Sequence, residues 1–200
     1  MLNLSLIAAA ENQPLEIDEV KAHLRITGTD EDDYLAGVIL PSAVASVEDA
    51  LSRPLVTQTW EWVWDGGFPA AGMLQFPLPP LIGVTHVKYK DTDGVEQTWA
   101  ASNYNVEVRG MYGRLWLADG VTWPTVQDNV PGVAWVRFTC GYGTDGDDIP
   151  GPIRNLVLLM CGHLYQNREP TITGSTITEV PLAWLSLVMQ NRALDFVHAP

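Results

Sequence analysis

Tryptophan takes every second position at the end of the stretch Thr57-Gln58-Thr59-Trp60-Glu61-Trp62-Val63-Trp64. Side chains in a β-strand alternate between the two faces, so Trp60, Trp62 and Trp64 lie together on one face of the predicted strand. An exposed row of three tryptophans would promote aggregation. We therefore expect this face to pack in a core, and a platform for sugar rings or a protein partner is the alternative.

Strand and turn signals continue from this stretch to residue 142. Apolar runs at 84–90 and 95–99 flank Asp91-Thr92-Asp93-Gly94, which predicts a β-hairpin. Residues 76–80, Phe-Pro-Leu-Pro-Pro, are excluded from a central strand because proline donates no ladder hydrogen bond. Further strands are expected at 104–108, 114–117 and 133–140.

Helical patterns precede this β-rich part. A first helix is predicted near residues 16–25, with Ile17 and Leu24 on one face. A longer helix follows, with apolar residues at i+4 spacing up to residue 51 and Asp30 as its expected cap. Pro41 lies inside this pattern and predicts a kink, because it removes one backbone hydrogen bond.

Helical patterns also follow the β-rich part. Asp148 is the expected cap of a helix with prolines at 150 and 152, positions suited to a first turn. Its apolar stripe runs from Ile153 to Leu164, and a last helix is predicted over 181–196. The chain is therefore predicted to be a single α+β domain over 1–200. Its small helical bundle, from 14–54 and 148–196, carries a β-rich insertion at 55–142.

Composition excludes several classes of protein. Hydrophobic residues make up 46% of the 200 residues, so wholesale disorder is excluded. The 24 acidic and 11 basic residues give a net charge of −13, which disfavours ordinary nucleic-acid binding. The apolar run 156–161 is too short for a bilayer, and the apolar N-terminus lacks the basic residues of a secretory signal. We expect no membrane association.

No motif predicts catalysis, a metal or a cofactor. Cys161 and His163 lie two apart on a helix, so their side chains diverge and we interpret them as buried helix residues. Asp91, Asp93 and Glu96 imitate part of a calcium loop, but the hairpin turn explains them. Phosphate-binding and nucleophile-elbow motifs do not occur. We expect no enzyme. A hydrolase built on two carboxylates and a carbohydrate-binding module with exposed tryptophans remain as alternatives.

The order of several segments resembles the head–tail connector (adaptor) proteins of tailed bacteriophages. The resemblance runs from about residue 14 to 190. It rests on LEIDEVKAHLRI at 15–26, LSRPL at 51–55, TQTWE at 57–61, LPPL at 78–81, VTHVKY at 84–89, VRFTCGYG at 136–143, IP at 149–150 and YQNRE at 165–169. Two residues depart from the family pattern: Glu16 replaces a Thr or Ser cap, and Pro41 interrupts the long helix.

The resemblance implies a structural protein of the virion neck that is assembled in the host cytoplasm. It implies a homo-oligomeric ring, usually of twelve copies, docked on the portal and joined to the next neck connector or the tail terminator. The genome would pass through its channel without specific binding, and the segment 171–200 would reach toward the portal.

Two sets of residues are candidates for these roles. Acids that line a channel would repel the DNA backbone and let it slide. The candidates are Asp30, Glu31, Asp32, Asp33, Asp145, Asp147 and Asp148. The β-branched segment 171–178 is either a partner for a neighbouring sheet edge or a loop. The candidate contacts with neighbouring subunits or partners are Trp123, Thr176, Ile177, Trp184 and Phe196.

Overall fold

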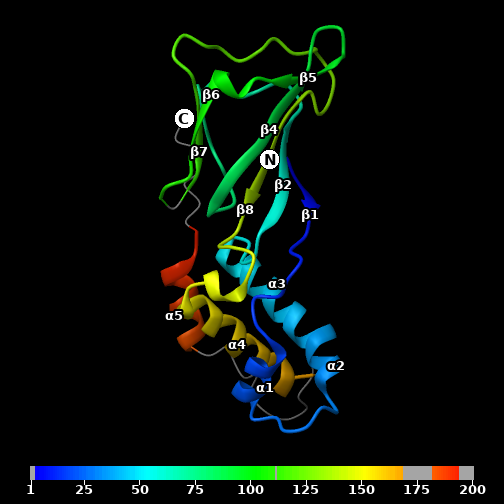
Figure 1. The fold of residues 1–200 in the computed structure, drawn as a ribbon, viewed down its shortest axis with the longest axis vertical. Helices are drawn as coiled ribbons and strands as arrows, with labels where there is room; N and C mark the ends of the chain where they lie inside the picture. Colours follow the sequence, from blue (N-terminus) through cyan, green and yellow to red (C-terminus); the bar gives the residue numbers. More distant parts are fainter. Residues whose placement is uncertain (1–2, 111, 169–181, 194–200) are drawn as a thin grey trace. The chain divides into compact units, whose positions relative to one another are not determined.

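The computed structural model describes residues 3–110, 112–168 and 182–193, and it has a mixed α+β fold (Figure 1). The chain forms two compact units, and each unit contains two segments of the sequence. The sheet unit comprises residues 1–11 and 57–142. The helical unit comprises residues 12–56 and 143–200.

The sheet unit contains two antiparallel sheets. The first has the strand order β1-β2-β8-β4-β5, with β1 at Asn3–Ala8, β2 at Gln58–Trp64, β8 at Ala134–Cys140, β4 at Leu81–Lys90 and β5 at Glu96–Trp99. The second has the order β3-β7-β6, with β3 at Met73–Gln75, β7 at Arg114–Leu117 and β6 at Tyr104–Glu107. Strand β1 was not predicted from the sequence.

The tryptophans of β2 face the core, as the alternation predicted. In the register of β2 on β8, Trp60 lies opposite Phe138 and Trp62 opposite Val136. Trp62 is only 5% exposed, and Trp60 and Trp64 pack against the same core. Buried residues of the second sheet, Leu74 and Leu115, belong to this core. The faces of the two sheets therefore pack on each other.

The helical unit is assembled around α4 (Gly151–Gln166), which contacts α1 (Ile17–Leu24), α3 (Leu40–Leu51) and α5 (Leu182–Asn191). A short helix α2 (Asp32–Tyr34) precedes α3, and a 3₁₀ turn (Gly146–Asp148) precedes α4. The segments from both sides of the β-rich part therefore pack together, as the sequence predicted. Fully buried side chains of α3 and α4 form the core, among them Leu40, Val47, Leu51, Ile153 and Leu156.

Pro41 interrupts the long helix in a specific way. Residues Leu35–Ile39 form a π-helix, in which the Leu40 N–H donates to the Leu35 carbonyl oxygen. The irregularity near Pro41 is thus a π-turn that ends two residues before the proline, and the kink stays a prediction. The whole helical stretch Asp32–Leu51 is long and apolar enough to span a membrane, a property that core helices share, and its inward face is buried in the helical unit.

Two predicted caps are wrong. The helix after Asp30 begins at Asp32 with Glu31 in the N-cap position, and neither acid caps it through its side chain. Helix α4 begins three residues after Asp148, with Pro150 as its N-cap, because the 3₁₀ turn takes up the intervening residues. Glu16 occupies the N-cap of α1 without a side-chain hydrogen bond, as expected for a residue that replaces Thr or Ser.

Candidate functional site

Within residues 3–110, 112–168 and 182–193, no group of three or more His, Cys, Asp or Glu side chains is placed to hold a metal ion. Cys161 is buried in α4, and burial raises the pKa of its thiol to about 11. The protonated thiol is a poor metal ligand and nucleophile at neutral pH. Asp91 uses its carboxylate within the hairpin turn, where it accepts hydrogen bonds from the N–H groups of Asp93 and Val95.

Ion pairs neutralise part of the first acidic cluster, which comprises residues 30–33. The Glu31 carboxylate lies 2.7 Å from the Arg168 guanidinium and also accepts a hydrogen bond from the Tyr165 hydroxyl. These contacts, led by the one with Arg168, lower the pKa of Glu31. Asp32 lies 2.7 Å from Lys21 Nζ on α1. Asp30 and Asp33 are exposed, and neither forms an ion pair with another described residue.

In the second acidic cluster, Asp145, Asp147 and Asp148, one acid is likewise paired with a basic residue and the others are not. Arg154 on α4 bridges Asp147 at 2.9 Å and Glu19 of α1 at 2.6 Å. Asp145 accepts a hydrogen bond from the Asn12 amide at 3.5 Å. Asp145 and Asp148 are exposed and, within the described parts of the chain, form no ion pair.

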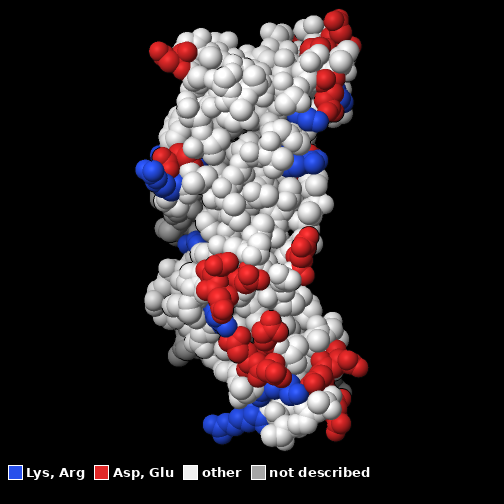
Figure 2. Space-filling view, in the orientation of Figure 1, with Lys and Arg blue, Asp and Glu red and all other residues white. Residues whose placement is uncertain are grey.

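Negative charge is concentrated in the helical unit. By sequence that unit carries 15 acidic and 6 basic residues, a net charge of −9, whereas the sheet unit carries 9 and 5, a net charge of −4. On the face shown in Figure 2, acidic side chains gather over the helical unit, and most of the sheet unit is uncharged. Sequence reasoning found the acidic clusters but missed the lysine and arginines that neutralise three of the seven candidate acids.

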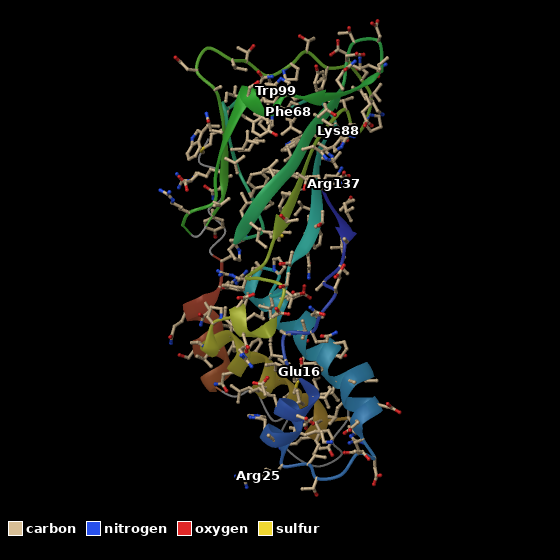
Figure 3. All side chains as sticks on the ribbon, viewed as in Figure 1. Glu16, Arg25, Phe68, Lys88, Trp99 and Arg137 are labelled. Atoms are coloured by element: carbon tan, nitrogen blue, oxygen red, sulfur yellow. The ribbon has the colours of Figure 1, made fainter. Side chains whose placement is uncertain are left out.

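The candidate contact residues have different settings. Trp123 stacks on Phe68 at a centroid distance of 4.4 Å and packs against the tilted ring of Trp99 at 5.1 Å. Its indole N–H donates to the Ala71 carbonyl oxygen at 3.1 Å. Phe68 and Trp99 lie close together in the sheet unit (Figure 3). Trp184 has a buried indole nitrogen without a hydrogen-bond partner among the described residues. Thr176, Ile177 and Phe196 lie outside the described residues.

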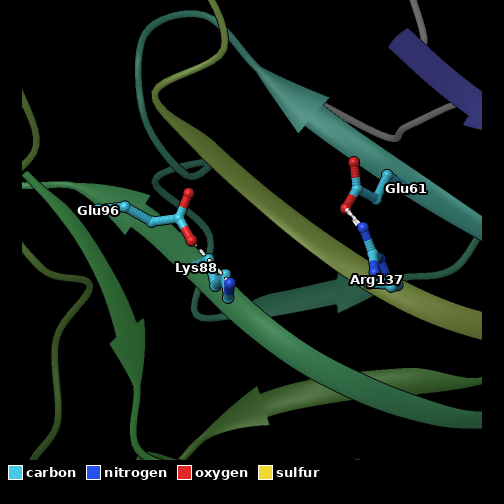
Figure 4. Close-up of polar contacts among 4 residues, drawn as sticks. All are labelled: Glu61, Lys88, Glu96 and Arg137. Carbon is cyan, nitrogen blue, oxygen red and sulfur yellow. Dashed lines mark hydrogen bonds and ion pairs between the residues drawn. The ribbon is translucent and has the colours of Figure 1, made fainter.

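The outer face of the first sheet carries two ion pairs that the sequence did not reveal. Arg137 on β8 donates two hydrogen bonds to Glu61 on β2, at 2.9 and 2.7 Å, and Lys88 on β4 donates to Glu96 on β5 at 2.7 Å (Figure 4). The cross-strand register places these partners opposite or near each other. Cross-strand ion pairs of this kind stabilise the surface of a sheet and do not by themselves indicate a reactive site.

The tryptophans do not form the exposed platform that a carbohydrate-binding module needs. Trp62 and Trp99 are buried, and the six other tryptophans are half-buried. The Trp60–Trp62–Trp64 row packs in the core of the sheet unit. The arrangement therefore gives no support to the carbohydrate-binding alternative.

Comparisons with known proteins give a family match for part of the chain and solved structures of similar fold. Residues 14–105 match the model of the phage gp6-like head–tail connector proteins. No curated protein matches the sequence. A chain from the neck of an empty gene transfer agent (GTA) particle, computed with C6 symmetry, is 21% identical with a TM-score of 0.77, and the match covers 98% of both chains.

A chain from the neck of the native GTA particle, computed with C12 symmetry, is 22% identical. Its TM-score is 0.75, and the match covers 100% of this chain and 98% of the other. A chain from the virion of the native GTA particle is 21% identical, with a TM-score of 0.76 and 98% coverage of both chains. The fold of these neck proteins thus extends over both units. Residues 14–105 thus carry the sequence pattern of the phage gp6-like head–tail connector proteins, and this match together with the shared fold supports a structural connector role.

Proposed function

We propose that copies of this chain assemble into a ring of about twelve subunits in the neck of a phage-like particle. The ring joins the DNA-filled head to the tail. The observation that carries this proposal is the family match over residues 14–105, together with a fold shared over the whole chain with neck proteins of symmetric particles. The protein acts by assembly alone, without catalysis or a cofactor, and it assembles in the host cytoplasm.

The ring has a different neighbour on each side. One side docks on the portal protein, and the other receives the next neck connector or the tail terminator. Trp184 is a candidate for such a contact because its ring is only half-buried and lies next to the exposed Leu185 on α5. Trp123 is a weaker candidate, since its ring and its N–H are already engaged within the sheet unit.

The genome passes through the ring, and acids on the helical unit face it. Asp30, Asp33, Asp145 and Asp148 are the best candidates among the seven because the other three are neutralised by basic partners. Unpaired carboxylates repel the phosphate backbone, so the DNA slides instead of binding.

The ring is tested by measuring mass and negative-stain shape for the purified protein, alone and mixed with its portal. A ring of about a dozen subunits, or co-migration with the portal, supports the proposal. A stable monomer that does not bind the portal protein would contradict the proposal.

The channel acids are tested in the assembled ring. A variant with Asp30→Asn, Asp33→Asn, Asp145→Asn and Asp148→Asn should retain duplex DNA at low salt, whereas the wild-type ring should not. The matched control carries Glu11→Gln, Asp93→Asn, Asp119→Asn and Asp128→Asn, which remove the same number of charges from four exposed acids of the sheet unit. Equal retention by the two variants would assign the effect to net charge and remove these four acids from the channel.

A further inference from the structure

The more acidic unit of the protein contains three helical stretches without any charge. Residues 34–47, 155–167 and 182–191 contain no Asp, Glu, Lys or Arg, although the helical unit has a net charge of −9. The stretch 155–167 lies on α4, against which the other helices pack, so the stretches 34–47 and 182–191 are the ones on the outside of the unit. Copies of a strongly acidic unit repel each other, so their contacts favour uncharged surfaces. These two stretches are therefore the first places to examine for contacts between subunits.

The first stretch presents a face of small side chains. Val38, Ser42 and Ala45 follow each other at i, i+4 and i+7, and all three are exposed. Gly37 next to them is also exposed, and a Cβ atom there would meet nothing within 4 Å. We call Gly37, Val38, Ser42 and Ala45 the small face. Small side chains let another helix approach closely.

This small face belongs to an unusually apolar helix. The stretch 32–51 is apolar enough to pass as a membrane-spanning helix, yet only 33% of its most apolar part is buried. Its opposite face, with Leu35, Ile39 and Val47, accounts for that burial. The exposed residues of the stretch 34–47, Ala36 and the small face, form an uncharged surface that a single copy does not cover.

The second stretch presents large side chains. On α5, Leu185 and Met189 are one helical turn apart and are 47% and 75% exposed. Val188 on the same helix is only 8% exposed, so the other side of α5 packs on its own unit. We call Leu185 and Met189 the large face. Methionine is flexible and fills irregular gaps well.

The two faces lie at different places on one unit. The small face covers residues 37–45, directly after α2, and in Figure 1 α2 and α5 lie on opposite sides of α4. Helix α5 contacts α3 near the other end of the long helix, where the Ala193 N–H donates to the Leu51 carbonyl oxygen. A contact between two different faces of the same subunit is heterologous, and its repetition produces a ring or a filament.

We propose that the large face of one copy packs against the small face of the next copy. This inference rests on the proposed ring and names the contact that closes it. The occupant is a second copy because the two faces complement each other in side-chain size, both are uncharged, and they lie apart on the same unit. Each subunit then gives one face and receives the other.

Chemical crosslinking tests the pairing of the faces. A variant with Val38→Cys and Met189→Cys is treated with a flexible bis-maleimide and separated under denaturing conditions. The native Cys140 and Cys161 are buried and do not react. The heterologous contact predicts a ladder that extends well beyond dimers. Each single variant should remain a 22.0 kDa monomer, because a cysteine on one face has no cysteine opposite it.

Other crosslinking results would overturn the proposal. Dimers from either single variant would indicate a symmetric contact. A double variant with Val95→Cys, a 55% exposed position of the sheet unit, in place of Val38→Cys is the matched control and should give no ladder. An equal ladder from this control would show that the crosslinks come from random collisions.

Insertion of a charge tests the proposed contact separately from the proposed ring. Met189→Glu places a carboxylate on the large face and should abolish the ring, whereas Val95→Glu should leave its mass unchanged. If Met189→Glu still forms rings and the double cysteine variant gives no ladder, the contact is wrong and the ring stands. If the wild-type protein forms no ring either alone or on the portal, both proposals fail together.

Discussion

The Arg168 guanidinium lies 2.7 Å from the Glu31 carboxylate, although the two residues are 137 positions apart in the sequence. It also lies over the rings of Tyr34 and Tyr165, at 4.7 and 4.6 Å from their centroids. Planar guanidinium groups combine ion pairing with stacking on aromatic rings. Arg168 therefore fastens the end of the α4 segment to the start of the long helix.

Substitution of Arg168 should weaken the helical unit modestly. We expect Arg168→Ala to lower the thermal midpoint more than Arg168→Lys does, because lysine keeps the charge and loses the planar stacking. The contact also gives a pH dependence. The lowered pKa of Glu31 means that its stabilisation is present above the ordinary value of 4.5 and is lost as the pH falls through the lower folded-state value. Thermal unfolding between pH 7 and pH 3 measures both effects.

Glu31→Gln is the control for this prediction. It removes the titrating group, so its loss of stability on acidification should be smaller than that of the wild type. Equal acid sensitivity in the two proteins would show that other carboxylates dominate the response.

Truncation of Phe76 should strongly destabilise the core of the sheet unit. This side chain is fully buried, with its ring centroid 4.9 Å from that of Phe138 and 6.4 Å from that of Trp62. Phe76→Ala leaves a cavity and should cost about 3–5 kcal/mol in the free energy of unfolding. Val95→Ala, at a 55% exposed position, should change it by less than about 0.5 kcal/mol. Urea unfolding followed by tryptophan fluorescence compares them, and a similar small change in both would contradict the packing of this core.

Local patterns made much of the fold predictable. The hairpin of β4 and β5 follows from Asp91 to Gly94, because the turn signal and the flanking strands are close in sequence. Strand β7 has the predicted bounds, Arg114–Leu117. The buried side of β2 followed from its alternating tryptophans, since a period of two assigns each side chain to a face.

Contacts distant in sequence were not predictable. Strand β1 alternates polar and apolar residues only over Asn3–Leu6, which is a short signal, and it is ordered by pairing with β2, where Leu4 lies opposite Trp62. The acids illustrate the same limit in the candidate site. Sequence showed that Glu31 lies in an acidic cluster, but its partner Arg168 is 137 positions away and follows a different helix. Such pairings depend on how the segments pack and leave no local signal.

Two glycines in the loop before α4 should differ in how much an alanine substitution destabilises the protein. A Cβ atom at Gly146 would overlap the backbone carbonyl of Pro14, whereas one at Gly143 would overlap the Asp148 side chain. At Gly146 the obstacle is the backbone of a segment distant in sequence, so two segments have to move apart. At Gly143 the Asp148 carboxylate can rotate away, but its Cβ atom at 2.6 Å cannot, so the loop itself has to shift. We therefore expect Gly146→Ala to cost about 1–3 kcal/mol and Gly143→Ala to cost less, because only one loop has to adjust. Urea unfolding followed by far-ultraviolet circular dichroism tests this order, which a larger loss at Gly143 would reverse.

The two native thiols should not react with thiol reagents in the folded protein. Cys140 and Cys161 are both fully buried, and burial raises the pKa of Cys161 to about 11. At pH 8 only roughly one Cys161 thiol in a thousand is then the reactive thiolate. We expect no reaction with a thiol reagent such as Ellman's reagent over minutes, and two thiols per chain after unfolding in guanidinium chloride. The Val38→Cys variant is the positive control and should show one reactive thiol when folded. Rapid labelling of one thiol in the wild-type protein would mean that α4 or β8 opens readily.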